Sequence, residues 1–266
     1  MNTAVNLNSN ISSLGKATIS FLEGWGHAWV FLIRTIKSIF IRPFRFVLLL
    51  EQLRSIGTDS LIVISLIGGF TGAVLAVQAE YTLSKFGATA FAGSAVALSL
   101  IRELGPVLTA LMVTGRAGSA MTAELGIMRI TEQVDALRSM AINPIQYLIV
   151  PRFLAGIIAM PILCAVFICV GIGGGYIVGV GLLGLSSGTF VGQMVSAVEL
   201  FDVYSGLIKA VVFGFIFGWV SCFKGYYCGF GALGVNKATT SSVVTTSVSV
   251  LILDYFLTSI LTRIFM

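Results

Sequence analysis

Residues 148–183 read LIVPRFLAGIIAMPILCAVFICVGIGGGYIVGVGLL, and Arg152 is the one charged side chain in this stretch. A hydrocarbon core about 30 Å thick is crossed by a helix of roughly 20 apolar residues. The stretch therefore predicts a transmembrane helix long enough to tilt or to project beyond the lipid. It indicates an all-α integral membrane protein.

The rest of the chain has the same character. It is 57% hydrophobic and 10% charged, against about 25% charged in soluble domains, and its mean hydropathy is +1.00. This composition excludes a disordered tail, a nucleic-acid-binding module and an ordinary cytosolic enzyme. We expect about five transmembrane helices within a domain over residues 61–266, preceded by a cytoplasmic N-terminus over residues 1–60. The other four predicted spans are Leu61–Tyr81, Ala88–Ala123, Val203–Phe223 and Val243–Ile264.

The basic residues predict the orientation of the spans. Most lie before the first span, between the second and third, or between the fourth and fifth: Lys16, Arg34, Lys37, Arg42, Arg45, Arg54, Arg129, Arg138, Arg152, Lys224 and Lys237. Only Lys85 and Arg263 fall on the other side. Since cytoplasmic loops carry the excess of Lys and Arg, we expect a cytoplasmic N-terminus and an external C-terminus.

Residues Phe21–Phe40 predict a different kind of helix. Glu23, His27, Arg34 and Lys37 share one helical face, and the opposite face carries Phe21, Trp25, Trp29, Leu32, Ile36 and Ile39. This pattern is typical of an amphipathic helix that lies in the membrane interface, and Pro43 would end it. The alternative is an additional span with snorkelling ends.

Catalytic and metal-binding motifs are weak or missing. The glycine cluster at 171–184 lacks the Lys-Ser or Lys-Thr of a phosphate-binding P-loop, so it predicts close helix packing instead, through Gly171, Gly175 and Gly179. The four cysteines form no C-x-x-C pair and His27 is the one histidine, so we expect no metal, no catalytic residue and no cofactor bound by this chain. Ser186 lies in a G-x-S-x-G match, which without a second histidine predicts an external loop.

Five ionisable residues fall inside predicted spans: Arg102, Glu103, Arg116, Lys209 and Asp254. Each costs roughly 2.5–3.5 kcal/mol at a helix centre, so these charges must pair, reach water or face a protein cavity. Arg116 is expected to reach the cytoplasmic interface, and Lys209 to snorkel. A functional polar site and an ion-pair network that only fixes packing are both compatible with this pattern.

Pro106 adds a predicted hinge. It has no N–H to donate to the carbonyl of Arg102, four residues earlier. The freed carbonyl allows the helix to bend next to the charged pair Arg102 and Glu103.

Residues 124–147 form the most polar stretch after the first 60 residues. Thr131 is placed to cap a short helix with Glu132, Gln133 and Asp135 in its first turn. Val134 and Leu137 would make its apolar edge. A short amphipathic helix in a cytoplasmic loop suits docking to a soluble partner, and the alternative is an ordinary solvated loop helix.

Several motifs then resemble one family. They are Ile101-Arg-Glu-Leu-Gly-Pro106, Gly115-Arg-Ala-Gly-Ser-Ala120, Ala123-Glu-Leu-Gly126, Met128-Arg-Ile-Thr-Glu-Gln133, Asp135-Ala-Leu137, Asn143-Pro144, Pro151-Arg152 and Lys237-Ala-Thr-Thr240. Together they are similar to the MlaE/YrbE permeases, from about residue 20 to the end of the chain.

This resemblance implies the permease of an ABC-type lipid transporter in the Gram-negative inner membrane. Two permease copies would form its core, with cytoplasmic ABC ATPases that bind ATP and Mg, a STAS-domain protein and periplasmic MCE-domain subunits. Such a complex moves phospholipid between the inner membrane and periplasmic carriers and supports outer-membrane lipid asymmetry. It has no nucleic-acid partner.

The resemblance also implies roles for individual residues. The segment 124–143 would couple the permease to the ATPase through Glu124, Arg129, Glu132, Gln133, Asp135 and Leu137. The charges Arg102, Glu103, Lys209 and Asp254 match charged positions of the family's membrane domain. The first span would supply the wall of a lipid cavity through Leu75, Gln78, Thr82 and Phe86.

Three other functions compete with this interpretation. An ion- or proton-driven carrier would use Arg102, Glu103, Lys209 and Asp254 as a relay. An intramembrane hydrolase would need Ser186. A structural anchor for periplasmic subunits would show no ATP-dependent conformational change.

Overall fold

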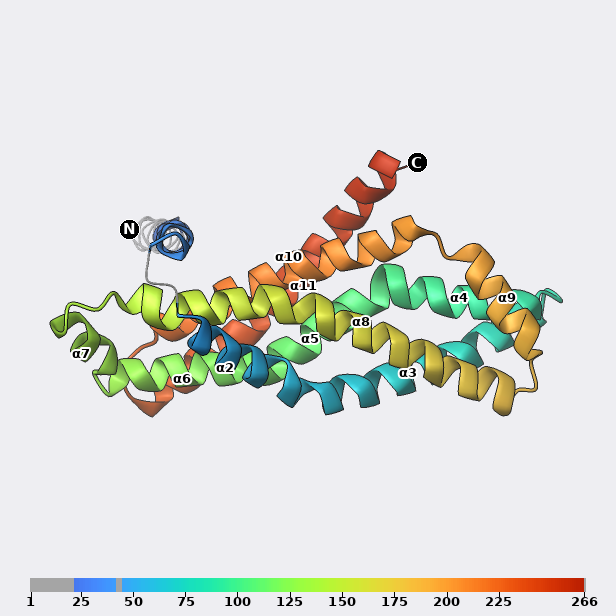
Figure 1. The fold of residues 1–266 in the computed structure, drawn as a ribbon, viewed down its shortest axis with the longest axis horizontal. Coiled ribbons are helices and arrows are strands. Elements are labelled where there is room, and N and C mark those ends of the chain that lie inside the picture. Colours follow the sequence, from blue (N-terminus) through green and yellow to red (C-terminus); the bar gives the residue numbers. More distant parts are fainter. Residues whose placement is uncertain (1–21, 42–44, 266) are drawn as a thin grey trace, which may run out of the picture.

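The computed structural model describes residues 22–41 and 45–265, and every regular element within them is a helix. Long helical segments run side by side in an elongated bundle (Figure 1). Five segments of the described chain are long and apolar enough to cross a membrane: Phe46–Ser84, Thr89–Ile130, Ile145–Gly181, Leu200–Tyr226 and Gly231–Arg263. The predicted all-α membrane fold with five spans is confirmed.

Most segments consist of several elements in series. The first segment consists of α2 (Phe46–Ile56), the 3-10 turn η1 (Thr58–Ser60) and α3 (Leu61–Ser84). The second segment begins with the 3-10 turn η2 (Thr89–Phe91) and α4 (Ala92–Ser99). It continues through the π-helical turn η3 (Leu100–Leu104), α5 (Gly105–Val113), the π-helical turn η4 (Thr114–Gly118) and α6 (Ser119–Ile130). The third joins the π-helical turn η5 (Ile145–Ile149) to α8 (Val150–Gly181). The fourth is α10 (Leu200–Tyr226), and the fifth is α11 (Gly231–Phe265).

Two segments begin well before their predicted starts, and one connection differs in structure. The first segment begins at Phe46, whereas the prediction started the span at Leu61, and the fifth begins at Gly231, whereas the prediction started it at Val243. The region after the third span was expected to be a loop, but it contains α9 (Ser187–Ala197). Packing stabilises this helix: Phe190 is 3% exposed, and a Cβ on Gly93 would lie 2.3 Å from the Phe190 carbonyl oxygen. The short helix α7 (Gln133–Ser139) lies at the other end of the bundle (Figure 1).

Glycine allows α3 and α8 to pack very closely. A Cβ on Gly72 would lie 1.7 Å from the carbonyl oxygen of Gly171, and one on Gly174 would lie 2.2 Å from that of Gly69. Small residues spaced four apart on both helices allow this approach. The close packing expected of the 171–184 glycines is confirmed, and its partner is a second set of glycines on α3.

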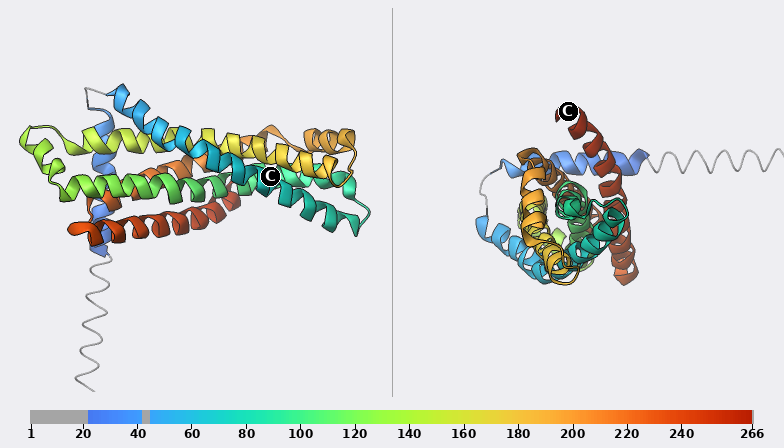
Figure 2. Two further views of the ribbon diagram at one scale, coloured as in Figure 1. Left: turned by 90° about the horizontal axis from the view of Figure 1, so that it is seen from below. Right: turned by 90° about the vertical axis from the view of Figure 1, so that its right-hand side faces the viewer.

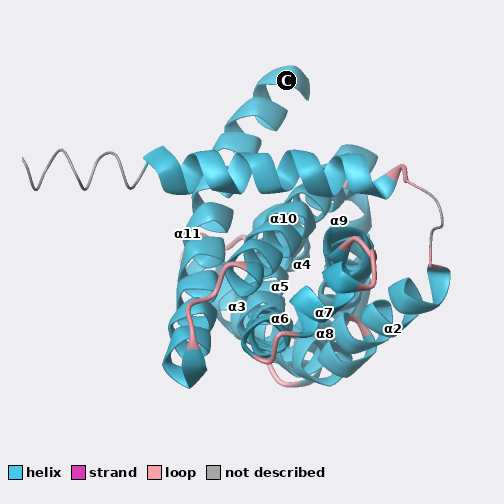
Figure 3. Cartoon of the chain, turned by 90° about the vertical axis from the view of Figure 1, so that its left-hand side faces the viewer, coloured by secondary structure: helices cyan, strands magenta, loops and turns pink. Residues whose placement is uncertain are grey.

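Residues 22–39 form a helix that crosses the bundle near the α7 end, roughly at right angles to the spans (Figure 2, Figure 3). Its Phe31 and Leu32 are buried against the bundle, whereas Trp25 and Trp29 are each 52% exposed. The indole N–H of Trp219, on α10, donates to the Ala28 carbonyl at 3.2 Å. The transverse course agrees with an interfacial helix and not with an additional span. Phe21 and Pro43 lie outside the described residues, as does all of the predicted cytoplasmic N-terminus before residue 22.

Candidate functional site

A buried lysine joins three spans. Lys209, on α10, is 1% exposed. Its ammonium lies 2.6 Å from Oε2 of Glu103, 2.7 Å from the hydroxyl of Thr258 and 3.1 Å from Oδ1 of Asp254. Glu103 belongs to the second segment, and both Thr258 and Asp254 belong to α11. Three of the five predicted intramembrane charges therefore form one network, and Lys209 pairs internally where the sequence predicted that it would snorkel.

The same ammonium also binds the main chain. Lys209 Nζ donates to the carbonyl oxygen of Arg102 at 2.9 Å. Pro106 follows four residues after Arg102 and lacks the N–H that an α-helix would offer to that carbonyl. The chain between them is the π-helical turn η3, a distortion that is frequent at functional sites. The freed carbonyl predicted from Pro106 is present, and a lysine side chain satisfies it; the hinge role of Pro106 stays a prediction.

Arg102 itself pairs elsewhere. Its Nε donates to Asp202 Oδ1, and Asp202 is fully buried at the start of α10, where its other oxygen accepts the backbone N–H of Glu199. Arg102 and Glu103 remain 44% and 42% exposed in their side chains. A charged face in the middle of a span is thus left open in the single chain.

Arg116 does not belong to this network. Its guanidinium donates to the Ser55 carbonyl at 3.0 Å and to the Ser60 hydroxyl at 2.8 Å, and lies 3.4 Å from an Asp59 carboxylate oxygen. These partners surround the junction of α2 and α3. Arg116 therefore connects the first two segments, away from Lys209.

The expected coupling segment is held by ion pairs within the chain. Arg152, which is 6% exposed, donates to Glu124 at 3.1 Å. Asp135 accepts from Arg129 at 3.1 Å and from Arg138 at 2.8 Å. Glu124 and Arg129 lie in α6, so residues 124–130 of the predicted segment are a continuation of the second span. Asp135, which was expected to face an ATPase, pairs with two arginines of its own chain and keeps 49% of its side chain exposed, so its role in coupling stays a prediction.

Arg138 extends this set of contacts to α10. It donates to the Tyr226 hydroxyl at 2.8 Å. That hydrogen bond, with a smaller contribution from the charge of Asp135, raises the pKa of Arg138 above its ordinary value. The α7 end of the molecule is thus linked through charged contacts to the last turn of α10.

The backbone is strained on both sides of α7. Glu132, immediately before the helix, has φ 59°, and Ala141, after it, also has φ 59°. Left-handed backbone is costly for residues other than glycine, and strain of this kind clusters at functional sites. The predicted Thr131 cap is wrong: its hydroxyl donates to the Ile127 carbonyl at 2.8 Å, and Glu132 occupies the capping position.

The other residues of the predicted coupling segment differ in how far they are buried. Glu132 and Gln133 are exposed, Leu137 is half-buried, and Val134 is fully buried. The apolar edge of the short helix thus packs on the bundle, as predicted. Its polar residues Glu132 and Gln133 face outward at the end of the molecule.

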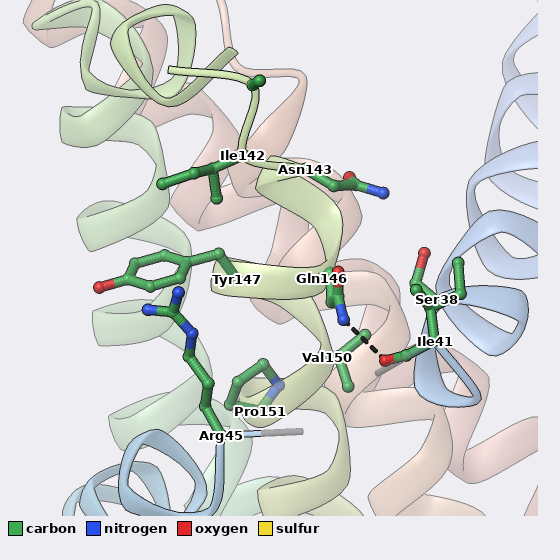
Figure 4. A pocket seen from close by; sticks show the side chains of 10 residues that line it. Ser38, Ile41, Arg45, Ile142, Asn143, Gln146, Tyr147, Val150 and Pro151 are labelled. Atoms are coloured by element: carbon green, nitrogen blue, oxygen red, sulfur yellow. Dashed lines mark hydrogen bonds between the residues drawn. The ribbon is translucent and has the colours of Figure 1, made fainter. Parts of the chain in front are cut away.

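A pocket of about 260 Å³ lies beside this segment, and Figure 4 shows its lining. Ile142 and Asn143 line it from the connection that follows α7. Gln146 donates to the Ile41 carbonyl at 2.7 Å, and Arg45 lies 4.7 Å from the centre of the Tyr147 ring (Figure 4). These contacts attach the transverse helix and the start of α2 to the end of the coupling segment.

The predicted lipid wall is only partly assembled. Of its four residues, Leu75 lines a shallow apolar groove of about 410 Å³ on α3, with Phe70 and Val74 among its neighbours. Gln78 and Thr82 are exposed farther along the helix. Phe86 lies beyond the end of α3, in the turn that contains Gly87 at φ 64°, so it does not continue the helical stripe.

Several residues of the site were missed from the sequence. Asp202 lies at a helix start, outside the predicted span; its spacing from Glu199 is the pattern of a capping box, which would have pointed to a buried helix end. Thr258 follows Asp254 by one helical turn and therefore shares its face. Arg138 and Tyr226 carry no local signal that would pair them.

The geometry gives little support to a serine hydrolase or to a metal site. Ser186 precedes α9, at the end of the bundle opposite the transverse helix that contains His27 (Figure 1). Ser186 and His27, the two residues that a serine hydrolase would use here, are therefore far apart. Within residues 22–41 and 45–265, no group of three or more His, Cys, Asp or Glu side chains could hold a metal ion.

Known proteins similar to this chain share most of its length. Residues 49–260 match the family described as Permease MlaE. The chain is 45% identical over 253 residues to a probable ABC transporter permease protein of Rickettsia bellii, an alignment that covers 95% of this chain and 98% of that protein. It is 46% identical over 253 residues to the intermembrane phospholipid transport system permease protein MlaE of Haemophilus influenzae, with 94% and 97% covered.

A more distant relative is the chloroplastic protein TRIGALACTOSYLDIACYLGLYCEROL 1 of Arabidopsis thaliana, 37% identical over 210 residues, which are 79% of this chain and 60% of that protein. The family match spans most of the chain, and the bacterial relatives align along nearly their whole length. Together with the five spans, these likenesses establish that the chain is a multi-pass membrane protein of the MlaE family of ABC transporter permeases.

Proposed function

We propose that two copies of this chain form the membrane core of an ABC transporter that moves phospholipid between the inner membrane and periplasmic carriers. The Haemophilus relative is named for intermembrane phospholipid transport, which supports phospholipid as the cargo. The transport would maintain the lipid asymmetry of the outer membrane. ATP and Mg would be bound by a partner ATPase, and this chain would be non-catalytic.

The observation that carries the proposal is the open charged face of the second segment. Arg102 and Glu103 are 44% and 42% exposed in their side chains, within a span where charges avoid acyl chains. In addition, the fifth span packs little against the rest of its own chain: only 11% of an apolar 18-residue stretch within it is buried. A second copy, enclosing a cavity for lipid between the two, would cover both surfaces.

Coupling to the ATPase would use the exposed part of α7. Glu132 and Gln133 are free to contact a soluble subunit, while the Asp135 ion pairs and the Glu124–Arg152 pair hold the helix on the bundle. ATP-driven movement of the ATPases would act on α7, pass through α6 and α8, and change the space between the copies. The basic residues near α7 support a cytoplasmic location for this end, a cytoplasmic N-terminus and a periplasmic C-terminus.

The family relation supports further partners. MCE-domain subunits would bind on the periplasmic side, near α9, and a STAS-domain protein would join the ATPases. The location would be the inner membrane of a Gram-negative bacterium, with no nucleic acid involved.

An intact-complex mass spectrum of the full chain, purified from its native membrane, tests the assembly. We expect two copies together with ATPase subunits and bound phospholipid. A single chain that binds no ATPase even after cross-linking would contradict the proposal.

Charge reversal tests the coupling assignment. Glu132→Lys should uncouple ATP hydrolysis from lipid transport without lowering the thermal stability of the permease, because Glu132 is exposed and takes part in none of the ion pairs formed among the described residues. Glu80→Lys, at the other end of the first segment, is the matched control and should remain coupled. Normal transport by Glu132→Lys would show that the assignment is wrong.

The Lys209 network is the one observation that suits an ion- or proton-driven carrier, since it gathers titratable groups from three spans. Such a carrier would transport lipid in response to membrane potential, without ATP. Transport by reconstituted complex that requires ATP and is unaffected by an uncoupler would exclude it.

A further inference from the structure

A cleft of about 420 Å³ opens between the transverse helix, α10 and α11. The transverse helix contributes Gly24, Trp25 and Ala28 to its lining. Figure 3 shows this helix lying across the end of the bundle, next to α10 and α11. The cleft lies on the outside of the bundle, away from the shallow groove on α3.

The floor of the cleft is apolar and its end is basic. Ile216, Val220 and Phe223 lie along one face of α10 and line it, and Lys224 follows in the last turn of the helix. From Ile216 to Lys224 the helix rises about 12 Å, so the cleft runs from the bundle end toward the middle of the span. Its volume lies within the usual range of ligand sites, about 300–1,000 Å³.

Lys224 is available to an anion. It takes part in none of the ion pairs formed among the described residues, and no acidic residue of the described chain lines the cleft. The hydroxyl-bearing residues Thr245 and Ser249, one turn apart on α11, line the opposite wall. The lining thus combines an apolar channel with one unpaired cation at its end, as an anionic amphiphile requires.

We propose that this cleft binds an anionic phospholipid, with an acyl chain along Ile216, Val220 and Phe223 and the phosphate at Lys224. The tryptophans of the transverse helix support membrane depth for the site, because Trp concentrates where lipid headgroups meet acyl chains. The bound lipid would fasten the transverse helix to α10 and α11. It occupies the outside of one chain, so it is distinct from the cargo of the proposed transport and does not depend on it.

The tryptophans also supply the measurement. All three in the chain are at this place: Trp25 and Trp219 line the cleft, and the rings of Trp29 and Trp219 are 5.4 Å apart. A full-length variant with Trp25→Phe and Trp29→Phe leaves Trp219 as the only tryptophan of this chain. Its complex is titrated in mixed micelles with phosphatidylglycerol brominated on the acyl chain, and in parallel with brominated phosphatidylcholine.

We expect saturable quenching of Trp219 by brominated phosphatidylglycerol at lower mole fraction than by brominated phosphatidylcholine. Lys224→Gln should raise the half-saturating fraction of phosphatidylglycerol about tenfold, while Lys37→Gln on the transverse helix leaves it unchanged. Equal curves for the two lipids, or no change in Lys224→Gln, would overturn the proposal.

Two glycines provide a steric test on the same background. A Cβ would meet nothing within 4 Å at either Gly24 or Gly26, but only Gly24 lines the cleft. Gly24→Leu should fill the cleft and reduce the quenching plateau at least twofold, and Gly26→Leu should retain it. Equal plateaus in the two variants would assign the quenching to bulk lipid and refute the proposal. Quenching of Trp219 that appears only after the complex is dissociated into single chains would assign the cleft to a second copy and would also refute it.

Discussion

Lys209 and Arg102 are joined side chain to main chain: the lysine ammonium donates to the arginine carbonyl at 2.9 Å. The two residues lie on different spans, and both carry positive charge. The contact exists because Pro106 removes the helical donor for that carbonyl and because η3 widens the helix there. The carbonyl that Pro106 leaves without a helical donor is thus bound by a cation from another helix, which ties the π-helical turn η3 to α10.

Removing the ammonium should destabilise the fold. Lys209→Met preserves the length of the side chain but leaves Glu103, Asp254 and the Arg102 carbonyl without their cationic partner. Loss of one member of a buried ion pair costs about 3–5 kcal/mol. The free energy of unfolding, measured by titrating the purified protein from mild detergent into SDS, should fall by about that amount.

The same substitution at Lys224, in the last turn of α10, controls for the loss of a lysine and should change the unfolding free energy little. Adding Asp254→Asn to Lys209→Met should restore part of the loss, since one uncompensated carboxylate is removed. Wild-type stability of Lys209→Met would refute the structural role of the network.

The glycine contact between α3 and α8 gives a second prediction. In Gly72→Ala the new methyl group would lie 1.7 Å from the Gly171 carbonyl oxygen, so the helices must separate. Overpacking of this kind costs about 1–3 kcal/mol, and we expect a lower melting temperature in a size-exclusion thermal-stability assay. Gly173→Ala, on α8, meets nothing within 4 Å and should melt at or above the wild-type temperature; equal melting of both variants would contradict this packing.

Relief of strain at Ala141 should stabilise the α7 region. Its left-handed backbone, φ 59°, costs about 1–2 kcal/mol for an L-residue, whereas glycine adopts it freely. Ala141→Gly should therefore slow amide hydrogen exchange over residues 133–142. Ala136→Gly, within α7, should instead accelerate exchange, because glycine costs about 1 kcal/mol in a helix interior. Faster exchange in Ala141→Gly would argue against the strained turn.

Alkylation of Cys228 in the folded protein should require a higher pH than alkylation of an ordinary thiol. Burial raises the pKa of its thiol, against a smaller lowering by the nearby Arg129 charge. Because the thiolate is the reactive form, peptide-resolved labelling with iodoacetamide should reach its plateau rate at a pH above the ordinary thiol pKa of about 8.5. The same peptide from unfolded protein should reach its plateau near that ordinary value.

Arg129→Gln provides the sign test for this thiol. Removing a positive charge destabilises the thiolate, so the inflection of the folded protein should move to still higher pH. A shift to lower pH, or an inflection of the wild-type protein below that of the unfolded peptide, would contradict the half-buried position of Cys228.

Local sequence signals predicted the spans well. Each apolar run became a helix, because twenty consecutive apolar residues have few alternatives to crossing a bilayer as a helix. The same reasoning identified Pro106 and the 171–184 glycines, whose effects act on the backbone next to them. It failed at α9, where Ser-Gly composition indicates a loop and tertiary contacts stabilise a helix, among them those of Phe190 with Gly93 and with Tyr176.

The pairing of charges was beyond local reasoning. Lys209 meets Glu103 106 residues away along the chain, and Arg138 meets Tyr226 across 88 residues. Such partners depend on which helices are neighbours and on their axial register. Phe86 illustrates the same limit: helical spacing placed it on the α3 stripe, but the helix ends at Ser84.

The amino-acid sequence by itself determined a five-span helical membrane protein with polar groups that must be satisfied inside it, because the low dielectric of lipid dictates both the helices and the need for partners. The tertiary structure alone decided which partners those are: Asp202 for Arg102, and Glu103 with Asp254 for Lys209. It also moved Arg116 to the α2–α3 junction. The reason is geometric, since a helical pattern specifies which side a residue faces, whereas the order, tilt and register of the packed helices specify what it faces.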